Sequence, residues 1–165
     1  GKKLTLTWAP HPKALPAAVP NQIMMTAAML GMEVTVAHPE GFELDPAIVA
    51  RARGRAACGG GSVTISHDPA ATLGADVVYA KSWSGFAGYA DREVEADLRA
   101  VTDGWMMTEE RLGRAGFMHC LPVRRNVVVE DAVLDGPQSW VTAQAGMRMW
   151  TAMALLEHLG RGGSW

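Results

Sequence analysis

The stretch Phe117–Asn126, with the sequence FMHCLPVRRN, decides how the rest of the chain is interpreted. A short apolar run enters it, Pro122 interrupts it and two arginines follow, which is the pattern of a buried strand that ends in a polar loop. In a parallel α/β sheet, ligands bind beyond the carboxyl ends of the strands. The stretch therefore predicts a strand whose end presents polar groups to a ligand.

The residues of this loop allow both a structural and a functional interpretation. Cys120 is either a small buried apolar residue or a thiolate favoured by nearby positive charge. Pro122 disfavours a helical conformation at Leu121, which leaves the Leu121 carbonyl free to face a ligand. Arg124 and Arg125 are either solvated or grip a carboxylate or phosphate in bidentate fashion. These residues alone support an anion site and a polar loop about equally.

Length and composition predict a single domain. The chain has 165 residues, 48% of them hydrophobic, and a formal net charge of -2. That is enough for one hydrophobic core, and the mixed charges indicate neither a nucleic-acid partner nor a membrane surface. The sequence has no apolar run of membrane-spanning length, no signal-peptide pattern and no metal-binding spacing of its two cysteines. We expect a cytoplasmic protein with free thiols, no metal and no cofactor.

Alternating strand and helix patterns predict an α/β fold, a doubly wound, Rossmann-like parallel sheet flanked by helices. The predicted strands are residues 4–8, 33–37, 62–66 and 76–80, followed by the strand of the opening stretch. The predicted helices are residues 21–31, 46–57, 69–73, 90–101 and 143–159, with a last short strand at residues 139–142. Asp45 and Asp68 are expected to cap the helices that follow them.

Two further segments follow predicted strands, and each has a simple structural interpretation. Ala9–Pro20 contains four prolines and is expected to be a stiff loop, in which position alone favours a rigid connection over a ligand-binding role for His11. Lys81 follows the fourth strand, where a lysine that extends its amine to solvent is the simpler interpretation. Arg148, in the last helix, is most simply an arginine at an amphipathic boundary.

Taken together, these segments resemble the aspartate/ornithine transcarbamylase superfamily, and within it the N-acetylornithine carbamoyltransferases. The sequence HCLP at residues 119–122, continuing as VRRNV, resembles the family signature. The sequences WAPHPK at residues 8–13 and VYAKSW at residues 78–83 resemble segments of the acetylornithine branch. The resemblance covers residues 3–159 but corresponds only to the second, amino-acid-binding half of a transcarbamylase. The resemblance therefore implies that 1–165 is a single domain and that the carbamoyl-phosphate-binding domain is absent.

The resemblance implies carbamoyl transfer from carbamoyl phosphate to the δ-amine of N-acetylornithine, in arginine biosynthesis, by a protein that is inactive without its other half. The residues that would orient the amino acid are His11, Lys81, Cys120, Leu121 and Arg124. Those that would contact carbamoyl phosphate are Cys120, Leu121 and Arg148, and Cys120 and Arg148 would act in catalysis. Lys81 would meet the substrate's α-carboxylate. Ordinary ornithine enzymes carry an aspartate in this lysine loop, and its absence implies a substrate whose α-amine is acylated.

The chain departs from the family pattern around its last helix. Residues 144–148 read QAGMR where the acetylornithine branch has Glu-Ala-Glu-Asn-Arg, and Val128 stands where family members carry a lysine. These losses point away from retained catalysis. The apolar residues of the same region predict a former interface rewritten as core packing; they are Trp140, Met147, Met149 and Trp150. An alternative function is therefore that of a non-catalytic stand-alone or engineered domain.

The resemblance also implies a deep trefoil knot, in which residues 81–89 thread through the loop of residues 9–20. Knots are rare, and only the family resemblance supports one here. A weaker alternative is a knotted methyltransferase-type domain that binds a nucleoside cofactor, although the loops lack the glycine pattern expected for it. The sequence leaves open the choice between acetylornithine and succinylornithine, and the oligomeric state.

Overall fold

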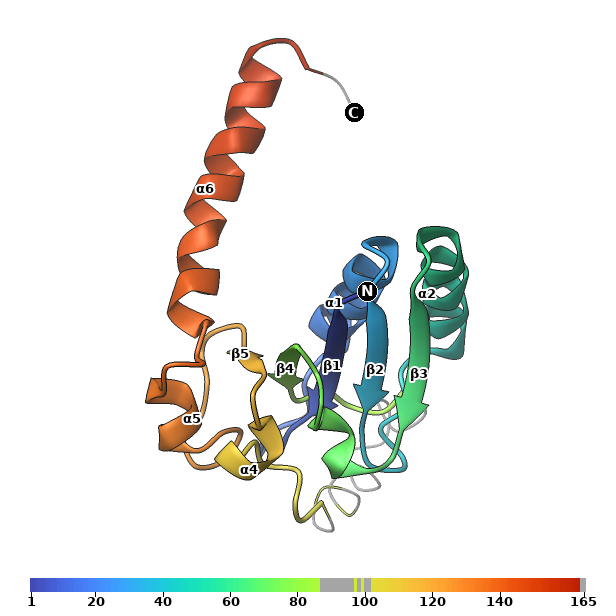
Figure 1. Cartoon of the computed structure of the whole chain (residues 1–165), viewed down its shortest axis with the longest axis vertical. Helices are drawn as coiled ribbons and strands as arrows, with labels where there is room; N and C mark the ends of the chain where they lie inside the picture. The colour runs from blue at the N-terminus through green and yellow to red at the C-terminus, as the bar shows by residue number, and fades with distance from the viewer. Residues whose placement is uncertain (87–96, 98, 100–101, 164–165) are drawn as a thin grey trace.

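Five strands form one parallel sheet in the computed structural model, which describes residues 1–86, 97, 99 and 102–163 (Figure 1). The strands are β1 (Lys3–Trp8), β2 (Glu33–Ala37), β3 (Ser62–Ser66), β4 (Val77–Lys81) and β5 (Gly116–Met118). Their spatial order is β3-β2-β1-β4-β5, and every pairing is parallel. The chain winds outward from β1 to β3 and then returns to the other side of β1 as β4. The predicted doubly wound sheet is confirmed, and its winding reverses between β1 and β4.

The helices connect these strands and extend beyond them. They are α1 (Ala18–Met29), α2 (Pro46–Gly59), the 3-10 helix η1 (Pro69–Thr72), α4 (Glu109–Leu112), α5 (Asp131–Asp135) and α6 (Val141–Gly160). The side chain of Asp45 accepts a hydrogen bond of 2.8 Å from the Ala47 amide, and Asp68 accepts one of 2.8 Å from the Ala70 amide. Both predicted helix caps are therefore present, and each satisfies a backbone donor that has no partner within its helix.

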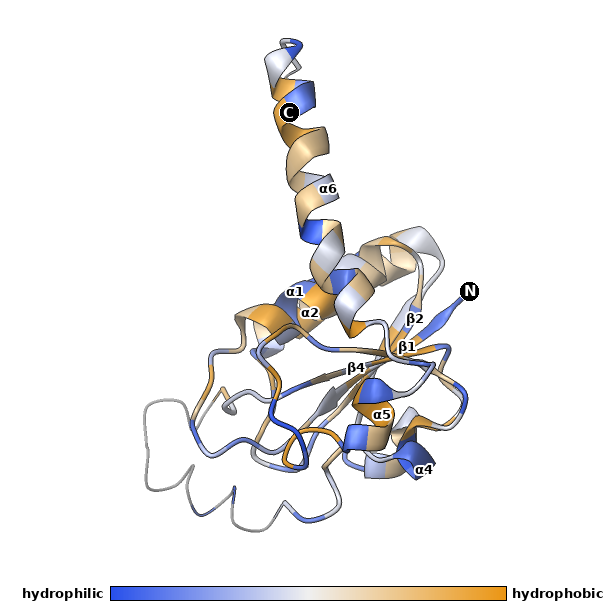
Figure 2. Ribbon diagram, turned by 90° about the vertical axis from the view of Figure 1, so that its left-hand side faces the viewer, coloured by the Kyte–Doolittle hydropathy of each residue, from blue (hydrophilic) through white to orange (hydrophobic). Residues whose placement is uncertain are grey.

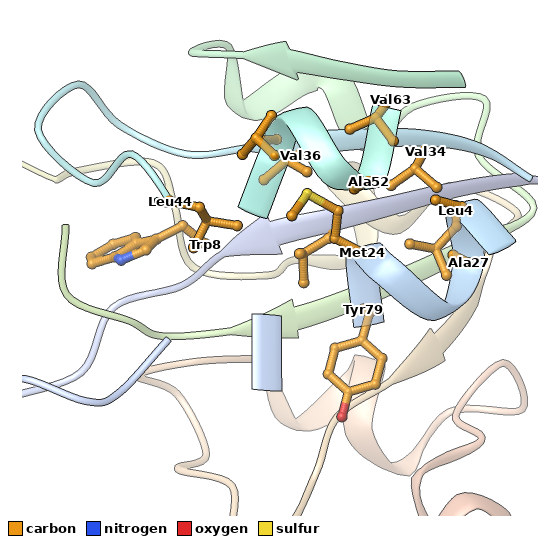
Figure 3. Close-up of a cluster of buried hydrophobic side chains, with 14 of the residues drawn as sticks. Leu4, Trp8, Met24, Ala27, Val34, Val36, Leu44, Ala52, Val63 and Tyr79 are labelled. Carbon is orange, nitrogen blue, oxygen red and sulfur yellow. The ribbon is translucent and has the colours of Figure 1, made fainter. Parts of the chain in front are cut away.

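Hydrophobic side chains cover both faces of the sheet. On one face, alternate residues of β1 such as Leu4 and Trp8 pack with Met24 of α1 and Ala52 of α2 (Figure 3). On the other face, Phe117 of β5 belongs to a second buried cluster with residues of α4, α5 and the loop at 128–129. Burial on both faces fits the apolar run of β4, whereas β1 alternates apolar residues with the buried threonines Thr5 and Thr7.

Arg111 is a half-buried cation that joins parts of the domain that are far apart in the sequence. Its guanidinium donates to the carbonyls of Pro69, Trp105 and Met106 at 2.8–3.0 Å and to the hydroxyl of Thr7 at 3.1 Å. The guanidinium also lies 5.6 Å from the ring centroid of Trp105. Burial lowers the pKa of Arg111 to about 10, so the side chain remains charged at neutral pH.

Three predicted elements differ from the structure. Helix α1 begins at Ala18, because Pro20 falls in the first turn, where a missing amide hydrogen breaks no helical hydrogen bond. The strand predicted at residues 139–142 is a single bridge between Ser139 and Phe117, and α6 begins at Val141. The helix at 69–73 is a 3-10 turn. The helix predicted at 90–101 falls largely outside the described residues.

The proline-rich loop of residues 9–20 contacts the segment that follows β4. The Ala9 amide donates to the Lys81 carbonyl at 3.1 Å, and the Ser84 amide donates to the Leu15 carbonyl at 2.9 Å. The two segments therefore run together at the carboxyl edge of the sheet. The knot expected from the family resemblance also involves residues 87–89, which lie outside the described residues, so the knot stays a prediction.

Helix α6 leaves the sheet and extends away from the body of the domain (Figures 1 and 2). Val141 is its only buried residue, whereas Met147, Met149 and Trp150 are each 57% exposed. The prediction that these residues form core packing is therefore wrong, because α6 lies on the sheet only at its first turn. No helix within the described part of the chain has both the length and the hydropathy needed to span a bilayer.

Candidate functional site

A cavity of about 180 Å³ lies beyond the carboxyl ends of β1, β4 and β5. We call it the edge cavity, and the residues that line it are His11, Leu15, Lys81, Ser82, His119, Cys120, Leu121, Pro122, Arg124 and Val128. Since Trp8 of β1 pairs with Lys81 of β4, the cavity lies where the winding of the sheet reverses. Ligands of doubly wound folds bind at this position. All five residues predicted to orient the amino acid are among those that line the cavity.

His11 and Arg124 join the two loops that border the edge cavity. Arg124 Nε donates to His11 Nε2 at 3.1 Å. Since Arg124 can only donate, His11 Nε2 accepts this hydrogen bond, and His11 Nδ1 lies 3.1 Å from both the amide nitrogen and the carbonyl oxygen of Lys13. Burial lowers the pKa of His11, and the charges of Arg124 and Lys81 lower it further, against the hydrogen bond to Lys13. His11 is therefore a neutral group that positions Arg124.

His119 lines the edge cavity, although no role was predicted for it. It is 3% exposed, and its Nδ1 has no hydrogen-bond partner within the described structure. Burial lowers its pKa to about 4, and the charge of Lys81 contributes in the same direction. An uncharged imidazole with an unpartnered nitrogen is suited to a ligand hydrogen bond, because a buried polar atom without a partner carries a desolvation cost. The HCLP signature was the available signal for His119.

Cys120 lines the edge cavity, and its thiol interacts with the hydroxyl of Tyr79. Burial raises the pKa of Tyr79 to about 12, and interaction with the Cys120 thiol adds to this shift. The peptide bond between Leu121 and Pro122 is cis. Leu121 is 55% exposed at the cavity mouth.

Arg125 does not line the edge cavity. Its guanidinium forms ion pairs of 2.7 and 2.8 Å with Asp135 and Asp131 at the two ends of α5. Asn126, with a φ of 53°, donates from its side chain to Asp131 at 2.8 Å. The two arginines of the opening stretch therefore differ, because Arg124 faces the cavity and Arg125 holds α5 against the loop.

Arg148 is not brought to the edge cavity either, because it is an exposed residue of α6. At the start of the same helix, the Gln144 side chain donates to the Tyr79 hydroxyl at 3.1 Å, while its own oxygen is buried without a partner. Val128 lines the cavity and is 2% exposed. Both departures from the family pattern thus lie within one layer of side chains from the cavity.

Arg99 borders a second, larger cavity of about 490 Å³, which shares His11 and Arg124 with the edge cavity. Its guanidinium donates to the His11 carbonyl at 3.1 Å, the Ser82 hydroxyl at 3.2 Å and the Trp83 carbonyl at 3.2 Å. Arg99 belongs to the amphipathic helix predicted at residues 90–101, and no functional role is predicted for it from the sequence. The structure shows that it ties the proline-rich loop to the segment after β4.

The edge cavity combines positive charge with neutral hydrogen-bonding groups. Lys81 and Arg124 are its only charged lining residues, and no aspartate or glutamate lies among the described residues that line it. A volume of about 180 Å³ is below that of sites for drug-sized ligands. The fold is that of the doubly wound α/β class, and the cationic lining of the edge cavity is chemically suited to a small anion such as a carboxylate.

Comparison with known proteins gives the family. Residues 16–159 match the Asp/Orn binding domain of aspartate/ornithine carbamoyltransferase. The chain therefore belongs to the aspartate/ornithine carbamoyltransferase family.

Several relatives are carbamoyltransferases of N-acylated ornithine, and others are ornithine carbamoyltransferases. The chain is 36% identical to an N-succinylornithine carbamoyltransferase of Bacteroides fragilis, over 95% of its own length and 46% of the relative. It is 38% identical to an N-acetylornithine carbamoyltransferase of Xylella fastidiosa, over 96% of this chain and 49% of that relative. A structure of acetylornithine transcarbamylase complexed with acetylcitrulline matches 88% of this chain and 45% of that one, with a TM-score of 0.85 and 38% identity. The chain thus spans a little under half the length of these relatives.

Proposed function

We propose that this chain is the amino-acid-binding half of an N-acylornithine carbamoyltransferase and that the edge cavity holds the acylated ornithine. The observation that carries the proposal is the meeting of Lys81, Arg124 and His119 in one cavity at the winding reversal. The family match places the chain among domains that bind aspartate or ornithine. Family membership also favours this function over that of a methyltransferase-type domain.

The charges of the edge cavity favour an acylated amino acid over a free one. Free ornithine carries an α-ammonium, which needs an anionic partner when it is taken out of water. The described residues that line the cavity include two cations and no carboxylate. An N-acyl group removes the ammonium charge and leaves the α-carboxylate to pair with Lys81. Relatives named for succinylornithine and for acetylornithine match similarly well, so both are proposed ligands.

Calorimetry with N-acetylornithine, N-succinylornithine and ornithine tests the proposal. We expect binding of at least one acylated ligand, and Lys81→Ala should weaken it about tenfold, as expected for the loss of a charged hydrogen bond. Lys13→Ala is the matched control, because Lys13 is an exposed lysine on the neighbouring loop and does not line the cavity. Its effect should stay within about twofold. Equal affinities for the parent and Lys81→Ala, or a preference for free ornithine, would contradict the assignment.

We further propose that catalysis requires a carbamoyl-phosphate-binding domain, supplied by another chain or another segment. The reaction needs a polarised carbamoyl carbonyl and a stabilised phosphate charge. Arg148 is an exposed residue of α6. It would contact carbamoyl phosphate when the carbamoyl-phosphate-binding domain lies against that helix. Incubation with carbamoyl phosphate and N-acetylornithine should therefore yield no acetylcitrulline above background from this chain alone. Product formed by the chain alone would show that the described half is sufficient.

A further inference from the structure

Three side chains that can bind a metal lie together at a part of the sheet edge away from the edge cavity. His38 follows β2, His67 follows β3, and Glu43 lies in the loop that leads to α2. One ligand atom from each of the three lies within 4.8 Å of the others. His38 is buried, whereas His67 and Glu43 are exposed. None of the three lines the edge cavity.

Backbone contacts fix the tautomers of both histidines. His38 Nδ1 lies 2.8 Å from the Pro39 carbonyl oxygen, and His67 Nδ1 lies 3.0 Å from the His38 carbonyl oxygen. A carbonyl oxygen can only accept, so each Nδ1 must carry the proton. Each ring is left with its lone pair on Nε2, the atom available to a metal. Histidine ligands of metal ions are commonly held in this way, through a hydrogen bond from the other ring nitrogen.

The carboxylate of Glu43 is also partly oriented. Its Oε1 accepts a hydrogen bond of 3.1 Å from the Gly41 amide, which leaves Oε2 for another partner. The Glu43 carbonyl accepts from the Phe86 amide at 2.8 Å, and the Phe42 carbonyl accepts from Trp83 Nε1 at 2.8 Å. The loop that carries Glu43 is therefore anchored to the segment that follows Lys81.

We propose that His38, Glu43 and His67 bind a divalent transition-metal ion, with Zn²⁺ as the best match. Two imidazole nitrogens and one carboxylate oxygen form a common zinc ligand set, in which water takes the fourth position. Tetrahedral zinc needs ligand atoms about 3.4 Å apart, so any pair of these atoms that is as far apart as the limit of 4.8 Å must move closer by somewhat more than ~1 Å. Since His67 and Glu43 are exposed, their side chains can make this movement while buried His38 stays in place.

Binding of this ion would join the ends of β2 and β3 to the loop before α2. Because that loop is hydrogen-bonded to Trp83 and Phe86, the ion would also stabilise the segment on one side of the edge cavity. The site does not depend on the proposed carbamoyltransferase function. It lies at the carboxyl ends of β2 and β3, whereas the edge cavity lies at those of β1, β4 and β5.

Titration of the chelator-treated, reduced chain with Co²⁺ and then Zn²⁺ tests the proposal. We expect one equivalent of Co²⁺ to give the visible bands of a tetrahedral ion without thiolate charge-transfer bands, and Zn²⁺ to displace it. His67→Ala and Glu43→Gln should each lower the affinity about tenfold or more. His158→Ala is the matched control, because it removes an exposed histidine of α6 and should change the affinity by less than about twofold.

A second measurement separates metal binding from misfolding of the variants. Zn²⁺ should raise the urea midpoint of the parent and of His158→Ala, whereas the midpoint of His67→Ala should be the same with and without Zn²⁺. Absence of saturable binding, thiolate bands that report Cys58 or Cys120 as ligands, or equal affinities of the parent and His67→Ala would each overturn the proposal.

Discussion

Large hydrophobic residues are buried in the sheet region but exposed on helix α6. Trp8 and Trp83 are fully buried in the sheet region, and each indole nitrogen donates to a backbone carbonyl. Trp150 of α6 is 57% exposed, and the leucines and methionines around it are exposed as well. In Figure 2, α6 extends from the body with hydrophobic residues along its length. Aromatic and aliphatic residues therefore contribute to stability in one region and remain without partners in the other.

The exposed large hydrophobic residues of α6 lie on all sides of the helix. They are Met147, Met149, Trp150, Met153, Leu155, Leu156 and Leu159. At about 100° per residue, these positions are distributed around the whole circumference rather than along one stripe. A helix that is apolar all round is usually buried within a larger assembly. The sheet region therefore has a complete hydrophobic core of its own. Helix α6, in contrast, has the composition of a helix that is covered by other parts of a protein assembly.

The largest effect is expected from removing a tryptophan of the sheet region. Trp83→Ala should lower the free energy of unfolding by about 3–5 kcal/mol, because it leaves a cavity and removes the hydrogen bond to the Phe42 carbonyl. Urea unfolding followed by far-UV circular dichroism measures the loss. Trp83→Phe, which retains most of the ring, should cost clearly less. A loss below about 1 kcal/mol for Trp83→Ala would break the contrast between the two regions.

An intermediate effect is expected from pH, through His119 at the end of β5. Since its pKa is lowered to about 4 in the folded chain, its contribution to stability is complete above pH 6.5 and is lost as pH falls toward 4. That loss is expected to reach about 2–3 kcal/mol at pH 4. Urea unfolding at pH 7 and pH 4.5 should show a smaller drop for His119→Gln than for the parent. Equal drops would mean that His119 titrates normally in the folded chain. The pKa values of His11 and His38 are also lowered by burial, so these two residues add to the drop in stability by the same amount in the parent and in His119→Gln.

The smallest effect is expected on α6. Trp150→Ala should change the free energy of unfolding of the chain alone by no more than about 0.5 kcal/mol, because its ring is exposed. The same urea experiment as for Trp83 provides the matched comparison. If α6 is covered by a carbamoyl-phosphate-binding domain as proposed, the substitution should instead weaken that association. A large loss of stability in the isolated chain would show that α6 already packs on the body.

Much of the fold could be predicted because local patterns and tertiary packing agree. Strands β2 and β3 have the predicted bounds, and the caps at Asp45 and Asp68 form as expected. The predictions failed where a local rule was applied too strictly, as at Pro20, which a first helical turn tolerates. They also failed on α6, because apolar composition indicates that a helix is to be buried but not by which part of the protein.

The site could be predicted in outline but not in detail. One cavity is lined by His11, Lys81, Cys120, Leu121 and Arg124, because each lies at or after the carboxyl end of a strand of the same parallel sheet. Their assigned functions stay predictions. Pattern alone could not separate Arg124 from Arg125, since the difference arises from two aspartates of α5. Nor could it find the His38, Glu43 and His67 cluster, whose members are 5 to 29 positions apart in the sequence.

Arg111 couples segments that are far apart in the sequence, so they should unfold together. One guanidinium holds the 3-10 helix after β3, the backbone at residues 105–106 and a hydroxyl of the central strand β1. If one of these segments detached alone, the guanidinium of Arg111 would lose a hydrogen-bond acceptor while it remained partly shielded from water. The region from Trp105 to Leu112 contains the four-residue helix α4 as its regular structure, yet it should open only together with the sheet.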